Sequence, residues 1–367
     1  MREIVIVIRD LYLEPERAGG PLVGRMAPQL GAASLSSGFD AGDGTGADAA
    51  ALAHLTRFGD KATLDEGWRD WVARWAGLPE LAAQPAASVA AASLEEVPPA
   101  GAVWLATPLH LVAGLTSLHF DRRSLLRLAP AELEALAADF RVVFRGSGFD
   151  LRPLAGGELL LTGTEASALS ITTEPARLPL ASIAAALPAG AGAPALRRLG
   201  AEIEMWLHGH AINDARLRRG EPPIGTLWVW GGGPAARSPA AAPRRSIEQV
   251  AFGSDPYVGG LWRLAGGEAR PMPVDSAAII GEARARGALA VVEVAELLHA
   301  NASWRLADAV AEIDRRLLSP ALAALHRGRL DRLVLLANDR CLTLRGRHRW
   351  RLWRRARPRR TGLEGLA

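Results

Sequence analysis

The sequence predicts an α/β fold in which a central, mostly parallel sheet is flanked by helices, with an α+β part inserted into it. Residues 3–8, 288–297 and 331–339 are short apolar runs, which are typical of strands buried on both faces of a sheet. The apolar residues of the stretch 303–318 recur at spacings of three and four, so we expect a helix between the last two strands. Strand–helix–strand order favours parallel strands joined by right-handed crossovers. A chain of 367 residues is long enough for such a sheet and an insertion.

The first hundred residues add a helix to the opening strand. In the stretch 66–77, four apolar side chains fall on one face of a predicted helix: Trp68, Trp71, Val72 and Trp75. Residues 82–102 are rich in alanine and proline, which is typical of a linker, although part of this stretch could form a poor helix.

The middle of the chain mixes predicted strands and helices. Residues 101–111 and 117–121 are strand-like, and Pro130 stands at the first turn of a predicted helix that runs to Phe140. Residues 149–163 are typical of a hairpin with a Gly-Gly turn. A helical stripe follows, made of Leu196, Leu199, Ile203, Trp206, Leu207 and His210.

The last third completes the alternation. Residues 254–267 predict a helix that ends at Gly266 and Gly267. Ser303 is the expected N-cap of the helix that carries Leu306, Val310, Ile313 and Leu317.

The stretch 208–233, HGHAINDARLRRGEPPIGTLWVWGGG, gathers most of the polar groups that could form a site. Arginine binds carboxylates and phosphates in a bidentate manner, so the stretch could hold a small anion. The candidates are His210, Asn213, Arg216 and Arg219. The alternative is that these residues cap helices, pack and form salt bridges. We expect the Pro-Pro pair to turn the chain into the strand TLWVW and the triple glycine to form a flexible turn.

Composition and charge limit the classes of function. The net charge of +4 gives no global field for nucleic acid, and no apolar run reaches the ~18 residues of a membrane span. The lone Cys341 excludes an internal disulfide, and without a signal sequence we expect a reducing cytoplasm. Nine arginines and no acid lie from Arg345 to Arg360, with Trp350 and Trp353 among them. Such a tail can bind nucleic acid or anionic lipid, but a packed or solvated end is the favoured interpretation.

The order of several motifs resembles archaeal-type cofactor-independent phosphoglycerate mutases of the alkaline-phosphatase superfamily. The run HAINDARLRRGEPP with its following GGG is similar to their HPVNxxRxxxGxxPAN stretch, and GGELLLTG and AVAEIDRRLLSPAL also have counterparts there. This resemblance spans about residues 117–340. The RpfE-type regulatory proteins of proteobacteria are more similar still, because they share EIxMxLHxH, the SLWLWGGG-like strand and an LWRxWRRRRP-like tail over nearly the whole chain.

The resemblance implies an alkaline-phosphatase-like core that is interrupted by an insertion. Residues 1–100 would form the N-terminal part of the core, and residues 101–200 the inserted α+β subdomain. Residues 201–344 would hold the motif junction and the C-terminal part of the core, followed by the Arg/Trp-rich tail at 345–367.

A mutase of this superfamily needs a nucleophilic serine and two divalent metal ions, which activate the nucleophile and hold the phosphoryl oxygens. At the positions implied for the serine and a ligand, this chain carries Ala50 and Ala51. The remaining candidates for metal ligands are Asp10, His54, His299 and Asp339, and Arg9 beside Asp10 is an unfavourable neighbour for a cation.

We therefore expect a catalytically degenerate relative without catalytic residues or cofactor. It would act as a cytoplasmic regulatory or interaction protein, with a protein partner or a small anionic ligand. The alternatives are an active mutase or phosphatase with Mn or Zn in a rearranged site, and a nucleic-acid-binding regulator that acts through its basic tail.

Overall fold

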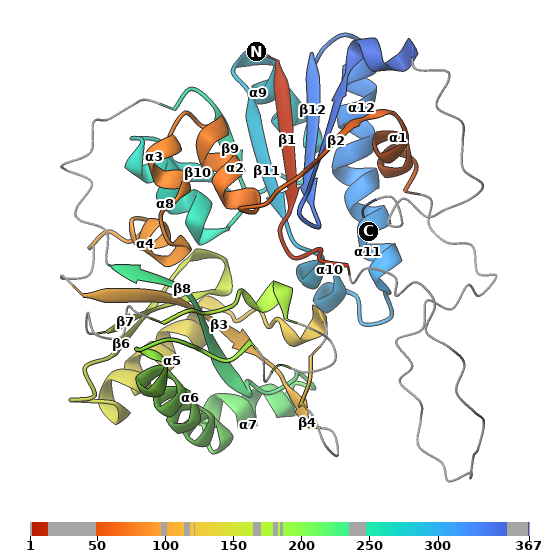
Figure 1. The fold of residues 1–367 in the computed structure, drawn as a ribbon. Helices are drawn as coiled ribbons and strands as arrows, with labels where there is room; N and C mark the ends of the chain where they lie inside the picture. Colours follow the sequence, from red (N-terminus) through yellow and green to blue (C-terminus); the bar gives the residue numbers. More distant parts are fainter. Residues whose placement is uncertain are drawn as a thin grey trace, which may run out of the picture.

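Two sheets in two lobes organise the chain (Figure 1). The structure, a computed structural model, describes residues 2–13, 49–96, 101–113, 118–120, 122–163, 170–178, 183, 186–234, 247–350 and 366. The first lobe is built from both ends of the sequence, and the second from the middle of it (Figure 1).

The first lobe contains a seven-stranded sheet with the order β10-β9-β11-β1-β12-β13-β2. Its strands are β1 (Glu3–Ile8), β2 (Asp60–Thr63), β9 (Val250–Phe252), β10 (Ala269–Arg270), β11 (Ala288–Val292), β12 (Arg332–Ala337) and β13 (Arg340–Arg345). The five strands from β10 to β12 run parallel, while β13 and β2 are antiparallel to their neighbours. The predicted mostly parallel α/β sheet is therefore confirmed.

Helices cover both faces of this sheet. Along β1, Ile4, Ile6 and Ile8 enter one core, whereas Val5 and Val7 enter the other. The first core is completed by α1 (Ala50–Phe58), α9 (Ser276–Ala285), α10 (Val294–Ala300), α11 (Leu306–Ile313), the π-helical turn η7 (Asp314–Leu318) and α12 (Ser319–His326). The second is completed by α2 (Trp68–Trp75), α3 (Pro79–Ala82) and α8 (Pro256–Leu264). Burial on both faces explains why the strand sequences are apolar without alternation.

The second lobe contains a four-stranded antiparallel sheet with the order β6-β7-β3-β8. Its strands are β3 (Ala102–Leu109), β6 (Asp150–Pro153), β7 (Leu159–Gly163) and β8 (Thr226–Pro234). Helices α5 (Pro130–Val143) and α6 (Ala193–His208) pack on one face, and α4 (Ala86–Ala91) packs on the other. Smaller elements are β4 (Val112–Ala113), β5 (Leu118–His119), α7 (Ala211–Arg218), and the 3-10 turns η1 (Arg122–Ser124), η2 (Ala155–Gly157), η4 (Pro175–Arg177) and η8 (Gly346–Trp350).

The helix at 66–77, the hairpin at 149–163 and the helical stripe before His208 are confirmed as α2, β6–β7 and α6. The interpretation of residues 82–102 as a linker is wrong for the part that forms α4, a buried helix between the lobes, and the alternative of a helix is confirmed there. Small alanines let it approach α8 so closely that a Cβ added at Gly260 would lie 1.9 Å from the Val89 carbonyl oxygen.

Two local predictions are also wrong. The N-cap of α11 is Arg305 rather than Ser303, and the Asp308 carboxylate accepts a hydrogen bond from the Arg305 amide at 2.8 Å. The triple glycine is the end of strand β8 and not a free turn. A Cβ at Gly232 would lie 2.0 Å from Nε1 of Trp104, so this position needs glycine because the indole ring packs against the backbone.

Strand β8 pairs with β3 along its length as far as Pro234. The second lobe therefore extends beyond residue 200, the end of the insertion that the family resemblance implies. Most of the Arg/Trp-rich tail, residues 351–365, lies outside the described residues. None of the described helices combines the length and the hydropathy that a membrane crossing requires.

Candidate functional site

The candidate site lies where the carboxyl ends of the parallel strands face the second lobe. Arg9 and Asp10 directly follow β1, and Glu293 directly follows β11. Asp255 follows β9 as the N-cap of α8, where its carboxylate accepts a hydrogen bond from the Val258 amide at 3.1 Å. This edge of a parallel sheet is the usual place for ligands and catalytic groups in α/β folds.

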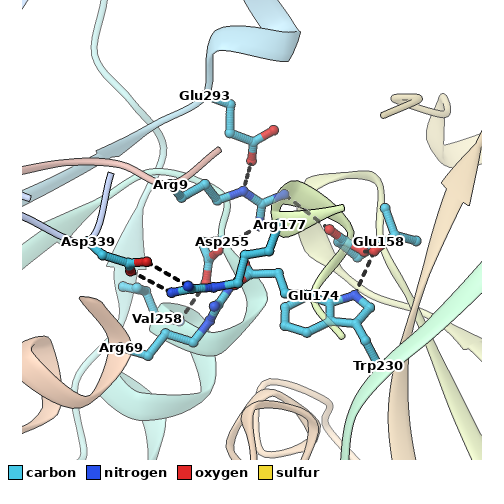
Figure 2. Close-up of polar contacts among 11 residues, drawn as sticks. Arg9, Arg69, Glu158, Glu174, Arg177, Trp230, Asp255, Val258, Glu293 and Asp339 are labelled. Carbon is cyan, nitrogen blue, oxygen red and sulfur yellow. Dashed lines mark hydrogen bonds and ion pairs between the residues drawn. The ribbon is translucent and has the colours of Figure 1, made fainter. Parts of the chain in front are cut away.

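Arg9 occupies the centre of this edge and pairs with three acids (Figure 2). Its Nη1 lies 2.6 Å from Asp255, its Nη2 lies 3.0 Å from Glu158, and its Nε lies 2.5 Å from Glu293. The Arg9 side chain is 13% exposed. Burial alone would lower the pKa of Arg9, but the three acids outweigh burial and raise the pKa well above its ordinary value. Arg9 is therefore a permanent cation at this place.

The second lobe contributes Glu158 through a tight turn. Gly156 has a φ of +73°, and a Cβ there would lie 2.2 Å from the carbonyl oxygen of Ser254, so only glycine allows this approach. The second carboxylate oxygen of Glu158 accepts a hydrogen bond from Thr107 Oγ1 at 2.7 Å. Thr107 in turn accepts one from Trp230 Nε1 at 2.8 Å. A buried polar chain thus connects strand β8 to Arg9.

Further arginines join the lobes around this centre. Arg127 pairs with Glu293, the acid that also holds Arg9. Arg69 pairs with Glu174 at 2.9 Å, and its guanidinium lies 4.4 Å from the ring centroid of Trp68 and 4.8 Å from that of Trp230. Such stacking adds cation–π attraction to the ion pair.

Asp10 is a helix cap in this structure. Its two carboxylate oxygens accept hydrogen bonds from the amides of Val294 and Ala295, at 2.7 Å each, and so begin α10. Burial and Glu293 raise the pKa of Asp10, although these amides and Arg9 act in the opposite direction.

At the other end of α10, Arg123 from the second lobe donates to the carbonyl oxygens of Leu298, Asn301, Ala302 and Trp304.

The other predicted metal ligands have separate roles. Asp339 and Asn338 have φ values of 52° and 51° and form the two-residue turn between β12 and β13, for which such residues are favoured. The Asp339 carboxylate binds Arg177 in a bidentate manner at 2.6 Å for each bond. Nε2 of His299 lies 2.8 Å from the Leu125 carbonyl oxygen, so this nitrogen carries the proton. The ring of His54 packs on α1, 4.6 Å from Phe58 and 5.2 Å from His326.

These four residues do not fit a divalent metal ion. Both oxygens of Asp10 are bound by amides, Asp339 is neutralised by a guanidinium, and the His299 nitrogen at the lobe junction is a donor rather than a ligand. Within the part of the chain that the structure describes, no three His, Cys, Asp or Glu side chains are arranged to hold a metal ion. The cation that lies between Glu158, Asp255 and Glu293 is the guanidinium of Arg9.

The candidates from the stretch 208–233 lie in or next to α7 on the second lobe, where three of them contact acids of α5. His210 is the N-cap of α7, where Nδ1 accepts from the Ile212 amide at 3.2 Å, and its Nε2 lies 3.2 Å from Asp139. Asn213 is buried, donates to the carbonyl oxygens of Leu207 and Ile224, and accepts from the Ile224 amide.

The two candidate arginines of this stretch bind acids of the same lobe. Arg216 is buried and lies 3.0 Å from Glu132, and it also donates to the Pro222 carbonyl oxygen at 2.9 Å. Arg219, which is 47% exposed, lies 2.6 Å from Glu132 and 2.8 Å from Glu221. An anion at this place would compete with both acids.

A small cavity of about 30 Å³ remains beside Arg9. Its wall includes Asp10, Thr107, Arg127, Glu158 and Trp230. A buried water needs roughly 10–15 Å³ of such space, so the cavity admits one or two waters rather than a phosphorylated sugar acid.

Arg9 stands out in the sequence as the neighbour of Asp10, whereas Glu158, Asp255 and Glu293 are not among the predicted site residues. A usable signal exists for two of them, because Asp255 and Glu293 both follow predicted strands whose carboxyl ends meet at one edge. Glu158 comes from the other lobe and has no such signal.

Comparisons with known proteins place few limits on the chain. No protein-family model and no curated protein sequence matches it. Among solved structures, it is similar to the cofactor-independent phosphoglycerate mutase of Thermoplasma acidophilum DSM 1728, with 16% identity, a TM-score of 0.35, and coverage of 80% of this chain and 81% of that chain. It is also similar to the PH0037 protein of Pyrococcus horikoshii, with 11% identity, a TM-score of 0.39, and coverage of 78% and 74%.

Proposed function

We propose that this protein is a catalytically degenerate relative of the cofactor-independent phosphoglycerate mutases that acts, like the RpfE-type proteins it resembles, as a regulatory or interaction protein of the cytoplasm. The observation that carries the proposal is the ion-pair centre of Arg9 with Glu158, Asp255 and Glu293. It lies at the sheet edge where the enzymes of this class would need metal-bound carboxylates.

The chemistry of this centre opposes phosphoryl transfer. A divalent metal would have to displace a permanent cation from its three acids, and like charges repel strongly in a poorly solvated place. The lining of the adjacent cavity contains no serine that could act as an activated nucleophile, and threonine is its one hydroxyl residue. That threonine, Thr107, is held between Glu158 and Trp230.

A role in interaction agrees with the way the two lobes are joined. Arg9, Arg123, Arg127 and Arg177 all make contacts between the lobes, so the centre fixes their relative position. We propose that the fixed pair of lobes presents surfaces to a protein partner or a small anionic ligand. Among the candidates from the stretch 208–233, Arg219 is the one whose side chain reaches solvent.

The test combines metal analysis with turnover assays on the purified full chain. Protein incubated with Mn²⁺ or Zn²⁺ and then freed of loose metal is expected to retain far less than one ion per chain, and to turn over neither phosphoglycerate nor an aryl phosphate. Asp10→Asn is the matched variant, because it removes the best-placed carboxylate of the alternative active site. Turnover that a chelator abolishes, and that Asp10→Asn also abolishes, would contradict the proposal.

A further inference from the structure

A second cleft opens at the opposite end of the seven-stranded sheet from Arg9. Strands β1 and β12 begin there and β13 ends there, at the top of the sheet in Figure 1. The six residues of β1 separate the two places by roughly 20 Å. The cleft has a volume of about 590 Å³, which is within the range of ligand sites.

Positive charge dominates the wall of this cleft. Arg2, Arg327, Arg345 and Arg347 all line it, together with the single acid Asp331. Arg2 neutralises this acid, with its Nη2 at 2.7 Å from Oδ1 of Asp331. The side chains of Arg327, Arg345 and Arg347 are exposed, and none of them makes an ion pair with an acid that the structure describes. Three exposed arginines therefore line one cleft, and none of the acids that the structure describes neutralises them.

The shape of the cleft leaves these groups accessible. A Cβ added at Gly328 or Gly346, two residues of the wall, would meet no atom within 4 Å. Leu325 and Leu330, the two leucines of the wall, are buried, so neither leucine side chain is exposed to a ligand. An open, cationic and polar recess is suited to phosphate groups rather than to an apolar molecule.

We propose that this cleft binds the sugar-phosphate backbone of a single-stranded nucleic acid. Arg327, Arg345 and Arg347 provide the phosphate contacts, and a recess accommodates a single strand better than it does a flat membrane surface. The chain leaves the cleft through η8, and the sequence of residues 351–360 adds six arginines, Trp353 and no acid. Positive charge thus continues along the chain, which suits a polyanion rather than a single phosphate. The inference is independent of the function proposed above.

The test measures binding of a fluorescent oligothymidylate of about 20 nucleotides to the full chain over a range of salt. Each phosphate contact to a single strand contributes about 0.7 log unit to the association constant at ~0.1 M salt. The double substitution Arg327→Glu/Arg347→Glu should therefore weaken binding by roughly 25-fold or more. It should also reduce the slope of log K against log salt concentration by about 1.4 in magnitude. Gly346→Glu places an acid in open space and should weaken binding in the same direction. Asp331→Asn frees Arg2 and should tighten binding by about fivefold, a gain that misfolding cannot produce.

The matched control reverses two arginines that are exposed on the second lobe, Arg145→Glu/Arg218→Glu, and keeps the same net charge as the cleft variant. The proposal requires that this control binds the oligonucleotide as the unchanged protein does. Equal losses in both double variants would show a diffuse charge effect and overturn the proposal. It is also overturned if the oligonucleotide fails to bind, or if vesicles containing phosphatidylserine bind and the oligonucleotide does not.

Discussion

Replacing Arg9 by methionine tests whether the ion-pair centre stabilises the fold. Methionine keeps much of the length of arginine but leaves three buried or nearly buried acids without their shared cation. Removing one partner of a buried pair costs about 3–5 kcal/mol, because a charge is left uncompensated. Each acid retains another partner. Asp255 keeps the Val258 amide and the attraction of Arg69, Glu293 keeps Arg127, and Glu158 keeps Thr107. We therefore expect the lower end, a loss of about 3 kcal/mol near neutral pH.

The loss should depend on pH in a defined direction. Burial alone would raise the pKa of Asp255, but Arg9 and Arg69 outweigh it and hold the pKa below its ordinary value. That lowered pKa contributes stability which is present above the unfolded pKa and is lost as the pH falls through the folded pKa. Without Arg9 we expect burial to dominate and the pKa to rise. Asp255 then takes up a proton on mild acidification. The difference in the free energy of unfolding between the unchanged protein and the variant therefore becomes smaller.

Unfolding in guanidinium chloride, followed by tryptophan fluorescence at about pH 8 and about pH 5.5, measures both effects. Arg74→Met is the matched control, because Arg74 is 55% exposed and pairs with two acids on the surface. Its midpoint should stay close to that of the unchanged protein. The reasoning is refuted if Arg9→Met loses no more free energy of unfolding than Arg74→Met does. It is also refuted if the loss for Arg9→Met grows on acidification.

Three further substitutions probe other parts of the account. Gly232→Ala places a Cβ where Nε1 of Trp104 lies, so we expect a loss of about 1–3 kcal/mol by chemical denaturation. Asn213→Ala leaves buried backbone groups unpaired and should cost about 3 kcal/mol, whereas a loss below about 1 kcal/mol would point away from a structural role. Burial and Glu66 raise the pKa of Asp70 to about 6, which carbon NMR can measure. Because the folded pKa of this acid is raised, stability is lost as the pH rises through about 6, so Asp70→Asn should stabilise more above this value than below it.

The sequence was informative where a single local pattern determines the structure. The apolar run at residues 3–8 belongs to a strand buried on both faces, and Trp68 and Val72 lie on one buried helix face. Residues 82–102 were misjudged because α4, which is mostly alanine, has only six residues, and a helix of this length is marginal in isolation. In the folded protein the same small side chains permit close packing between the lobes.

The candidate site was harder to predict because it depends on contacts between distant segments. Arg9 and Asp10 are adjacent in sequence but have opposite tasks, since one is a central cation and the other caps α10. Glu158 reaches Arg9 only because Gly156 lets its turn approach α8. Asn338 and Asp339 occupy the place implied for a ligand pair, yet their backbone conformation makes them a hairpin turn.

The most direct measurement of the central claim is anomalous X-ray diffraction from crystals of the full chain soaked in Mn²⁺. We predict that the Arg9 guanidinium remains in contact with Glu158, Asp255 and Glu293, with no manganese peak among these acids or at Asp10. A manganese peak bound by Asp10 or Glu293, with the Arg9 side chain displaced from the acids, would contradict it.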